Sequence, residues 1–117
     1  MALKKRGLQA FQRSLPQALD KGAEDTARQV LQIRNGLVPV DTGALLESGE
    51  ALAGPTQGHW IVREGAGLPD ARARWTEWGT ATQIAQPHLT PAAEQGRALL
   101  RRNVAARVTA LAGKTRP

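Results

Sequence analysis

The stretch Val38-Pro39-Val40-Asp41-Thr42-Gly43-Ala44-Leu45-Leu46-Glu47-Ser48 lies where a long helical pattern stops and a different kind of structure begins. Proline pushes the residue before it out of the helical region, so residues 38–40 are expected to be extended. Asp41 or Thr42 can then cap a short turn or helix that runs through Ser48, because the side-chain oxygen of either residue accepts a free backbone N–H. The stretch therefore predicts a passage from a long helix into a second, more irregular part of the fold.

Upstream of this stretch, apolar residues recur at steps of three and four, which indicates one face of an α-helix. The positions are Leu8, Phe11, Leu15, Leu19, Ala23, Ala27, Val30, Ile33 and Leu37. Pro16 interrupts the pattern, and Ser14 can act as the N-cap of a helix with Pro16 in its first turn. We therefore expect the main helix to span residues 15–35 and to stop at Gly36, with residues 3–13 forming a separate short helix.

Downstream, two short strands are expected at residues 50–53 and 59–64, joined by a five-residue loop rich in turn formers. Residues 65–74 contain two glycines and a proline, which are typical of a surface loop. Residues 75–80 suit either a strand or a short helical turn, and periodicity does not distinguish these over six residues. Residues 81–86 continue as a loop.

The last helix has a clear predicted start, with Thr90 as its N-cap and Pro91 at its first position. Glu94 follows in the first turn, where the helix dipole favours an acid. Apolar or small residues continue to the expected end at Gly113: Ala92, Gly96, Leu99, Leu100, Val104, Val108 and Leu111. The coarse order of helix, short helix, strands and helix indicates an α+β fold.

We expect a single domain over residues 1–117, in which a long N-terminal helix and a C-terminal helix pack on a small antiparallel β-sheet. Residues 1–13 form a basic N-terminal segment, residues 14–112 the core and residues 113–117 a frayed tail. Charge is unevenly placed along this domain. Residues 41–94 carry seven acids and three arginines, whereas residues 95–117 carry six basic residues and no acid.

The sequence offers no set of residues for catalysis, for a cofactor or for a metal ion. There is no cysteine, and neither His59 nor His88 has a local metal-ligand spacing. Glu64, Asp70 and Glu77 could in principle form a carboxylate cluster, but carboxylates in loops are usually solvated, and we expect that here. We therefore predict a protein that is not an enzyme and that binds no cofactor and no metal.

Three short motifs carry the remaining information. The first is Pro39, Thr42, Gly43, Leu45 and Ser48; the second is Glu77, Trp78, Gly79 and Thr80; the third is Pro87, Leu89, Pro91 and Ala92. In this order, and over about residues 14–95, they resemble the head–tail joining (tail-completion, or neck) proteins of long-tailed bacteriophages. The chain departs from that pattern at His88, where an aromatic residue is expected, at Thr90, where a basic one is common, and at Gly49, where an aliphatic one is.

The resemblance implies a structural virion protein that forms part of the neck between the DNA-filled head and the tail, and no membrane partner. Its implied partners are copies of itself in a ring, head-side connector proteins, the tail terminator or tail tube protein, and DNA that passes through the channel without sequence recognition. Its expected location is the virion, and the host cytoplasm during assembly. Six or twelve copies per ring are reasonable by analogy.

Four arginines of the last helix, Arg97, Arg101, Arg102 and Arg107, are candidate contacts to neighbouring copies or to an anionic partner. The acids that could meet them in the next copy are Glu50, Glu64, Asp70 and Glu77. The same arginines suit a second reading, a basic nucleic-acid-binding protein, although no aromatic residues are interleaved with them to stack on bases. A third possibility is that these arginines only form a solvated helix face. In the same way, Trp75 and Trp78 could simply fill the core. A toxin-like or hydrolytic enzyme would need a site near His59 and His88.

Overall fold

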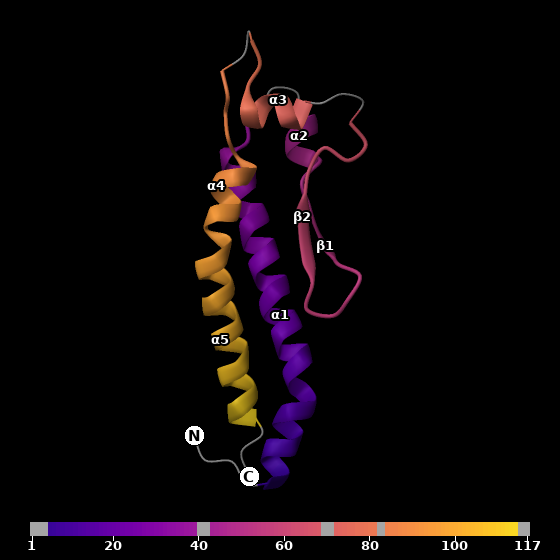
Figure 1. The fold of residues 1–117 in the computed structure, drawn as a ribbon, viewed down its shortest axis with the longest axis vertical. Coiled ribbons are helices and arrows are strands. Elements are labelled where there is room, and N and C mark those ends of the chain that lie inside the picture. The colour runs from indigo at the N-terminus through magenta and orange to yellow at the C-terminus, as the bar shows by residue number, and fades with distance from the viewer. Residues whose placement is uncertain (1–4, 40–42, 69–71, 82–83, 115–117) are drawn as a thin grey trace.

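The protein is an elongated α+β domain, 64 Å long and 23 × 19 Å in cross-section, that is built around one long helix (Figure 1). The computed structural model describes residues 5–39, 43–68, 72–81 and 84–114. The elements are α1 (Lys5–Leu37), α2 (Ala44–Glu47), β1 (Glu50–Ala53), β2 (Trp60–Arg63), α3 (Arg72–Trp78), α4 (Leu89–Glu94) and α5 (Gly96–Lys114). The predicted fold class, with long first and last helices and a small antiparallel sheet, is confirmed.

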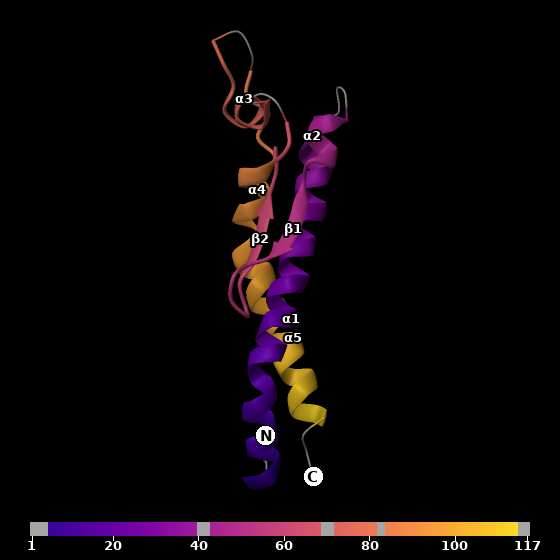
Figure 2. The ribbon, with the colours of Figure 1, turned by 90° about the vertical axis from the view of Figure 1, so that its right-hand side faces the viewer.

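Helix α1 lies between the other parts of the molecule. Helix α5 packs antiparallel along one side of it, and the β1–β2 hairpin lies against another side (Figures 1 and 2). The short helices α2 and α3 gather at the end of the rod where α1 finishes. None of the helices in the described ranges is long and apolar enough to cross a membrane.

Helix α1 is continuous, so the prediction of a separate helix at residues 3–13 is wrong for the residues that the structure describes. Pro16 lies inside the helix, and Ser14 is therefore not an N-cap. Proline removes the backbone hydrogen bond to the carbonyl four residues earlier, which is that of Gln12. Both Gln12 and Pro16 lie on the exposed side of the helix, where water can bind the freed carbonyl. Gly36 is likewise within the helix, which ends at Leu37.

The buried stripe of α1 is rotated by about one residue from the predicted one. Leu8, Leu19 and Leu37 are 44, 39 and 45% exposed. The buried positions include Ala18, Gly22, Thr26, Val30 and Arg34, which recur at every fourth residue. Residues four apart form a ridge along a helix, and small side chains in such a ridge let a second helix approach closely. The small residues, not the largest apolar ones, therefore define the face that meets α5.

Gly22 is the point of closest approach between α1 and α5. A Cβ atom there would lie 2.8 Å from Val104 Cγ2 and 2.9 Å from Val104 Cα. Beside it, Thr26 donates a hydrogen bond to the Gly22 carbonyl (2.8 Å), and the Asn103 side-chain amide donates one to the Thr26 hydroxyl (3.0 Å). The backbone of α5 thus leaves no room for a side chain at Gly22.

We therefore expect Gly22→Ala to lower the free energy of unfolding by about 1–3 kcal/mol, because the helices must move apart. The matched control is Gly36→Ala in the same helix, where nothing lies within 4 Å of the added atom. That change should raise stability by about 0.5–1 kcal/mol, the usual gain of alanine over glycine in a helix. Urea unfolding followed by circular dichroism measures both values. Equal effects at the two glycines would contradict the close approach.

The hairpin forms nearly as predicted. Strand β1 spans the expected residues, β2 is one residue shorter at each end, and the register pairs Glu50 with Arg63 and Ala53 with Trp60. Its tip is tied to α1 through Asp20, whose Oδ1 accepts hydrogen bonds from the Gly58 backbone N–H (2.8 Å) and from Trp60 Nε1 (3.1 Å). A two-stranded hairpin is marginal alone, so this attachment to a helix stabilises it.

Of residues 75–80, the first four form the end of α3, and Gly79 and Thr80 follow it outside any helix. The interpretation of both tryptophans as core residues is wrong. Trp75 is 44% exposed and Trp78 is 69% exposed, because Thr76 and Glu77 take the inward face of this short helix. The predicted loop over residues 65–74 is correspondingly shorter, because α3 begins at Arg72. The predicted cap at Asp41 or Thr42 lies outside the described residues.

Candidate functional site

A buried cluster of charged residues lies where α1, α3 and α4 meet the end of β2. Arg34 of α1 is its base, and this side chain is completely buried. Arg34 Nε and Nη2 donate to Glu64 Oε2 at 2.9 and 2.7 Å. The remaining N–H groups donate to the Leu45 and Leu46 carbonyls and to Asn35 Oδ1. A guanidinium offers five donors in a rigid fork, so one residue holds the end of α1, α2 and the residue after β2 together.

His88 occupies the opposite side of Glu64 and is also completely buried. Its Nε2 lies 2.8 Å from both carboxylate oxygens of Glu64, and its Nδ1 lies 3.1 Å from the Gln86 carbonyl and 3.5 Å from Glu77 Oε1. Both ring nitrogens thus face acceptor oxygens.

Glu77 completes the cluster and caps α4 from another element. Its Oε1 accepts hydrogen bonds from the backbone N–H groups of His88 (3.2 Å) and Leu89 (2.8 Å), and its Oε2 accepts one from Thr90 (3.1 Å). The first N–H groups of a helix lack partners within it, and a carboxylate there also complements the helix dipole. The predicted start at Thr90 is therefore wrong: α4 begins at Leu89 and its N-cap position, His88, makes no side-chain cap.

Two opposing effects act on the pKa of Glu77. Burial raises the pKa, whereas the three backbone hydrogen bonds and one from the Thr90 side chain lower it. The net result is a pKa below the ordinary value of 4.5. The hydrogen bonds favour the ionised form more than burial opposes it, so the capping carboxylate stays charged at neutral pH.

Gly49 makes room for the buried guanidinium. A Cβ atom at this position would collide with Nη1 and Cζ of Arg34. The aliphatic residue that the phage resemblance leads one to expect there would displace Arg34. The glycine and the arginine therefore fit each other as a pair.

Glu64, Glu77 and His88 each bring a possible metal-ligand atom within 4.8 Å of the others. These atoms already have partners, however: Glu64 Oε2 binds two N–H groups of Arg34, and the Glu77 oxygens bind three backbone N–H groups. A metal ion would have to displace those donors and would lie beside the guanidinium. The arrangement is suited to holding segments together rather than to binding an ion.

We therefore expect Zn²⁺ or Mg²⁺ at millimolar concentration to leave the melting temperature of the protein unchanged. A ligand that binds only the folded state raises stability in proportion to the logarithm of its concentration over Kd, so a real site would be visible. Differential scanning calorimetry with and without a chelator makes the comparison. A rise of several degrees that disappears in His88→Asn would overturn this assignment.

Each of the three motifs contributes at least one residue to the contacts of the cluster. Leu45 and Ser48 of the first motif lie in and after α2: the Leu45 carbonyl accepts from Arg34, and the Ser48 hydroxyl donates to that carbonyl and accepts from the Gly65 N–H. Gly43 and Gly79 have positive φ angles of 84° and 79°, as their turns require. The other motif residues in the described ranges are the half-buried Pro39, Leu89 and Pro91, the exposed Trp78, Thr80 and Pro87, and the buried Glu77 and Ala92.

The prediction that Glu64 and Glu77 are solvated, and the suggestion that they meet arginines of a neighbouring copy, are both wrong. Glu77 is 5% exposed, and Glu64 is enclosed by Arg34 and His88. Asp70 lies outside the described residues. Glu50 pairs with Arg63 on the facing strand. His59 is exposed, as expected of a residue at the start of a surface strand.

The four candidate arginines of α5 are all exposed, but they differ in their partners. Arg107 forms a two-point ion pair with Asp25 of α1, and its hydrogen bonds lower the pKa of Asp25. Arg97, Arg101 and Arg102 have no ion pair with any residue in the described part of the chain. These three form the basic surface that remains available for a partner.

Arg34 is the functional residue that sequence reasoning missed. Its position continues the series Ala18, Gly22, Thr26 and Val30. A charged residue on a buried stripe needs a buried partner of opposite charge, which was the available signal. No protein-family model matches the sequence, and comparisons with curated proteins and with solved structures also give no match.

Proposed function

We propose that this protein is a structural component of the virion of a tailed bacteriophage or prophage, a head–tail joining protein that assembles with copies of itself into a ring in the neck. Its role is mechanical: it connects the head-side proteins to the tail terminator or tail tube and leaves a channel for DNA. It requires no cofactor and carries out no reaction.

The observation that carries the proposal is the meeting of all three motifs in one buried cluster. Glu77 of the second motif binds the backbone at Leu89 of the third, while Arg34 joins the Leu45 carbonyl of the first to Glu64, which binds His88. Residues far apart in the sequence that meet in one place act as a unit. This supports the motifs as the signature of a fold rather than as three chance matches.

The shape and surface of the protein also suit assembly. The rod is 64 Å long, and Trp78, which is 69% exposed, belongs to α3 at one end of it (Figure 1). Exposed tryptophan is typical of interface centres, because a large rigid side chain buries much area at little entropic cost. Such a surface favours a protein that works in a complex.

Deletion of the gene from a producing phage tests the role. Electron microscopy of the lysate should then show DNA-filled heads and separate tails, and the protein supplied from a plasmid should restore joined particles. Joined virions in the absence of the protein would overturn the proposal.

A nucleic-acid-binding function is the second candidate, and it is favoured by Arg97, Arg101 and Arg102, which have no ion pair with any residue in the described ranges. This reading predicts tight binding of duplex DNA by the isolated protein, with log K falling linearly against log salt concentration. A neck protein should bind DNA weakly and without sequence preference. Fluorescence anisotropy across a salt series distinguishes the two functions. If the protein is a nucleic-acid-binding protein, Arg101→Glu with Arg102→Glu should abolish DNA binding. If it is a neck protein, the same variant tests whether these arginines are needed for ring assembly.

A further inference from the structure

The last turn of α1 contains the pair Asn35-Gly36, the dipeptide in which a side-chain amide reacts most readily with its own main chain. In this reaction the backbone nitrogen of the following residue attacks the asparagine Cγ, and glycine has no side chain to obstruct the approach. Both residues are exposed, and nothing lies within 4 Å of a Cβ atom added at Gly36. The sequence therefore places a candidate modification site at the point where the long helix ends.

The reaction is deamidation, and its only co-reactant is water. The Gly36 nitrogen loses its proton to water and forms a bond to Asn35 Cγ, while the bond from Cγ to the side-chain nitrogen breaks and this nitrogen leaves as ammonia with a proton from water. A water molecule then opens the cyclic imide. Cleavage of the newly formed C–N bond gives aspartate, whereas cleavage of the original peptide bond gives isoaspartate, whose main chain is longer by a single carbon.

The folded helix opposes this attack. Gly36 lies within α1, so its nitrogen belongs to the hydrogen-bonded ladder of the helix. The Val38 N–H donates to the Arg34 carbonyl at 3.0 Å and closes the last turn around the reactive pair. Ring closure requires the chain to leave the helical backbone conformation, so this turn has to open before Asn35 can react.

The buried Arg34 ties this turn to the rest of the protein. Its Nη1 donates to Asn35 Oδ1 at 2.8 Å and to the Leu46 carbonyl at 2.9 Å, while Nε and Nη2 bind Glu64. Opening of the turn breaks the bond to Asn35, so the free energy of opening includes a contact of the buried cluster. A donor at Oδ1 could also make Cγ more electrophilic, so protection and activation by Arg34 predict opposite effects when its fork of donors is removed.

We propose that Asn35 is a site of spontaneous deamidation whose rate is controlled by the buried cluster around Arg34. The site is closed while Arg34 holds the end of α1, and the imide forms when the turn opens. The isoaspartyl product has an additional main-chain carbon within the turn, so the bond from Val38 to the Arg34 carbonyl cannot form again in the same register. A transient opening thereby becomes permanent. The inference concerns the lifetime of the folded protein and does not depend on the neck function.

Peptide mass spectrometry of the full chain, incubated at neutral pH in buffer and in guanidinium chloride, tests the site. Conversion of Asn35 from amide to acid should be at least about tenfold slower in buffer than in denaturant, because only the open turn reacts. Asn103, the other asparagine of the chain, precedes the β-branched Val104 and should react slowly in both solutions. Gly36→Ala should slow the reaction at Asn35 in denaturant, because its side chain obstructs the attacking nitrogen.

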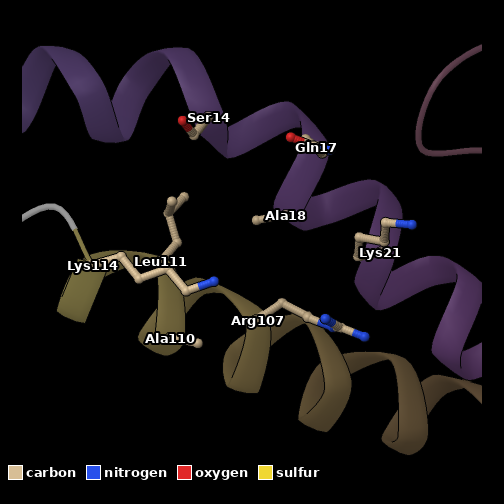
Figure 3. A pocket seen from close by; sticks show the side chains of 8 residues that line it. All are labelled: Ser14, Gln17, Ala18, Lys21, Arg107, Ala110, Leu111 and Lys114. Atoms are coloured by element: carbon tan, nitrogen blue, oxygen red, sulfur yellow. The ribbon is translucent and has the colours of Figure 1, made fainter.

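Two variants distinguish the cluster from overall stability. Arg34→Lys keeps the positive charge but lacks the forked donors, so in buffer Asn35 should react at least about tenfold faster than in the parent protein. Leu111→Ala is the control, because Leu111 points from α5 toward α1 beside a cavity of about 300 Å³, in the half of the rod away from the end of α1 (Figures 1 and 3). This change weakens the packing of the two helices but not the cluster, so Asn35 should react at nearly the parent rate.

Equal rates in buffer and in denaturant, or equal acceleration by the two variants, would overturn the proposal. Slower deamidation in Arg34→Lys would also overturn it, since the bond to Oδ1 would then activate the amide rather than hold the turn closed. Absence of reaction at Asn35 in denaturant would exclude the site itself. Hydrogen exchange at the Val38 amide is an independent readout of opening, and it should speed up in Arg34→Lys but not in Leu111→Ala.

Discussion

Replacement of Arg34 by methionine is expected to lower the free energy of unfolding by about 3–5 kcal/mol, the usual result of removing one partner from a buried ion pair. The change leaves Glu64 buried without its guanidinium and removes the donors to the Leu45 and Leu46 carbonyls. Small domains have about 5–15 kcal/mol in total, so the change removes a substantial part of the stability of the fold. Urea unfolding monitored by circular dichroism gives the value.

Arg28→Met in the same helix is the matched control. Arg28 also pairs with a glutamate, but its side chain is 61% exposed, and exposed pairs contribute about 0–1 kcal/mol. The loss in the free energy of unfolding for Arg34→Lys should lie between the losses for these two variants, because lysine keeps the positive charge but lacks the forked set of guanidinium donors. If Arg34→Met costs no more than Arg28→Met, the buried cluster does not hold the fold together.

Replacement of Glu77 by glutamine is expected to cost about 2–3 kcal/mol, because hydrogen bonds to a charged group are stronger than neutral ones and a helix cap is lost. Glutamine has nearly the same shape, but its NH₂ group faces N–H donors instead of accepting from them. Hydrogen exchange at the His88, Leu89 and Thr90 amides should speed up, which locates the effect. Glu50→Gln, at the exposed pair with Arg63, should cost less than about 1 kcal/mol.

The same residue predicts a dependence on pH. The pKa of Glu77 is lower in the folded protein than its ordinary value of 4.5, so the folded state binds a proton less readily than the unfolded chain. The contribution of Glu77 to stability is therefore complete above about pH 5 and is lost as the pH falls through the folded pKa. Unfolding measured from pH 7 to pH 3 should show a shallower loss in Glu77→Gln than in the parent protein. Parallel curves would contradict the assignment.

The sequence predicted the parts of this fold that depend on local patterns. Alternation and turn residues placed the β1–β2 hairpin to within one residue, and periodicity located both long helices. The sequence-based prediction failed where contacts with an element far away in the sequence determine where a helix begins. Pro16 and Ser14 together resemble a helix start, yet packing keeps α1 continuous, and Thr90-Pro91 resembles another, yet the carboxylate of Glu77 moves the start of α4.

The buried cluster could be predicted only in part. A charged Arg34 on a stripe of small residues is visible in the sequence, and it implies a buried acid somewhere. The choice of Glu64 from ten acidic residues depends on tertiary contacts thirty residues away, which no local pattern contains. The sequence marks His88 only as a departure from an aromatic position, whereas in the structure its ring is buried and lies 2.8 Å from Glu64.

The close approach of α5 to Gly22 has a consequence for how the protein is made. Residues 5–39 and 43–68 include α1, α2 and the hairpin, so all partners in their mutual contacts are synthesised before α5. The Ala18–Gly22–Thr26 face has to wait, because Val104 and Asn103 come some eighty residues later. Pairing over such a separation is slow to form. During translation this face of α1 is therefore exposed until α5 is made. Packing of α5 covers the face and so prevents its association with other nascent chains.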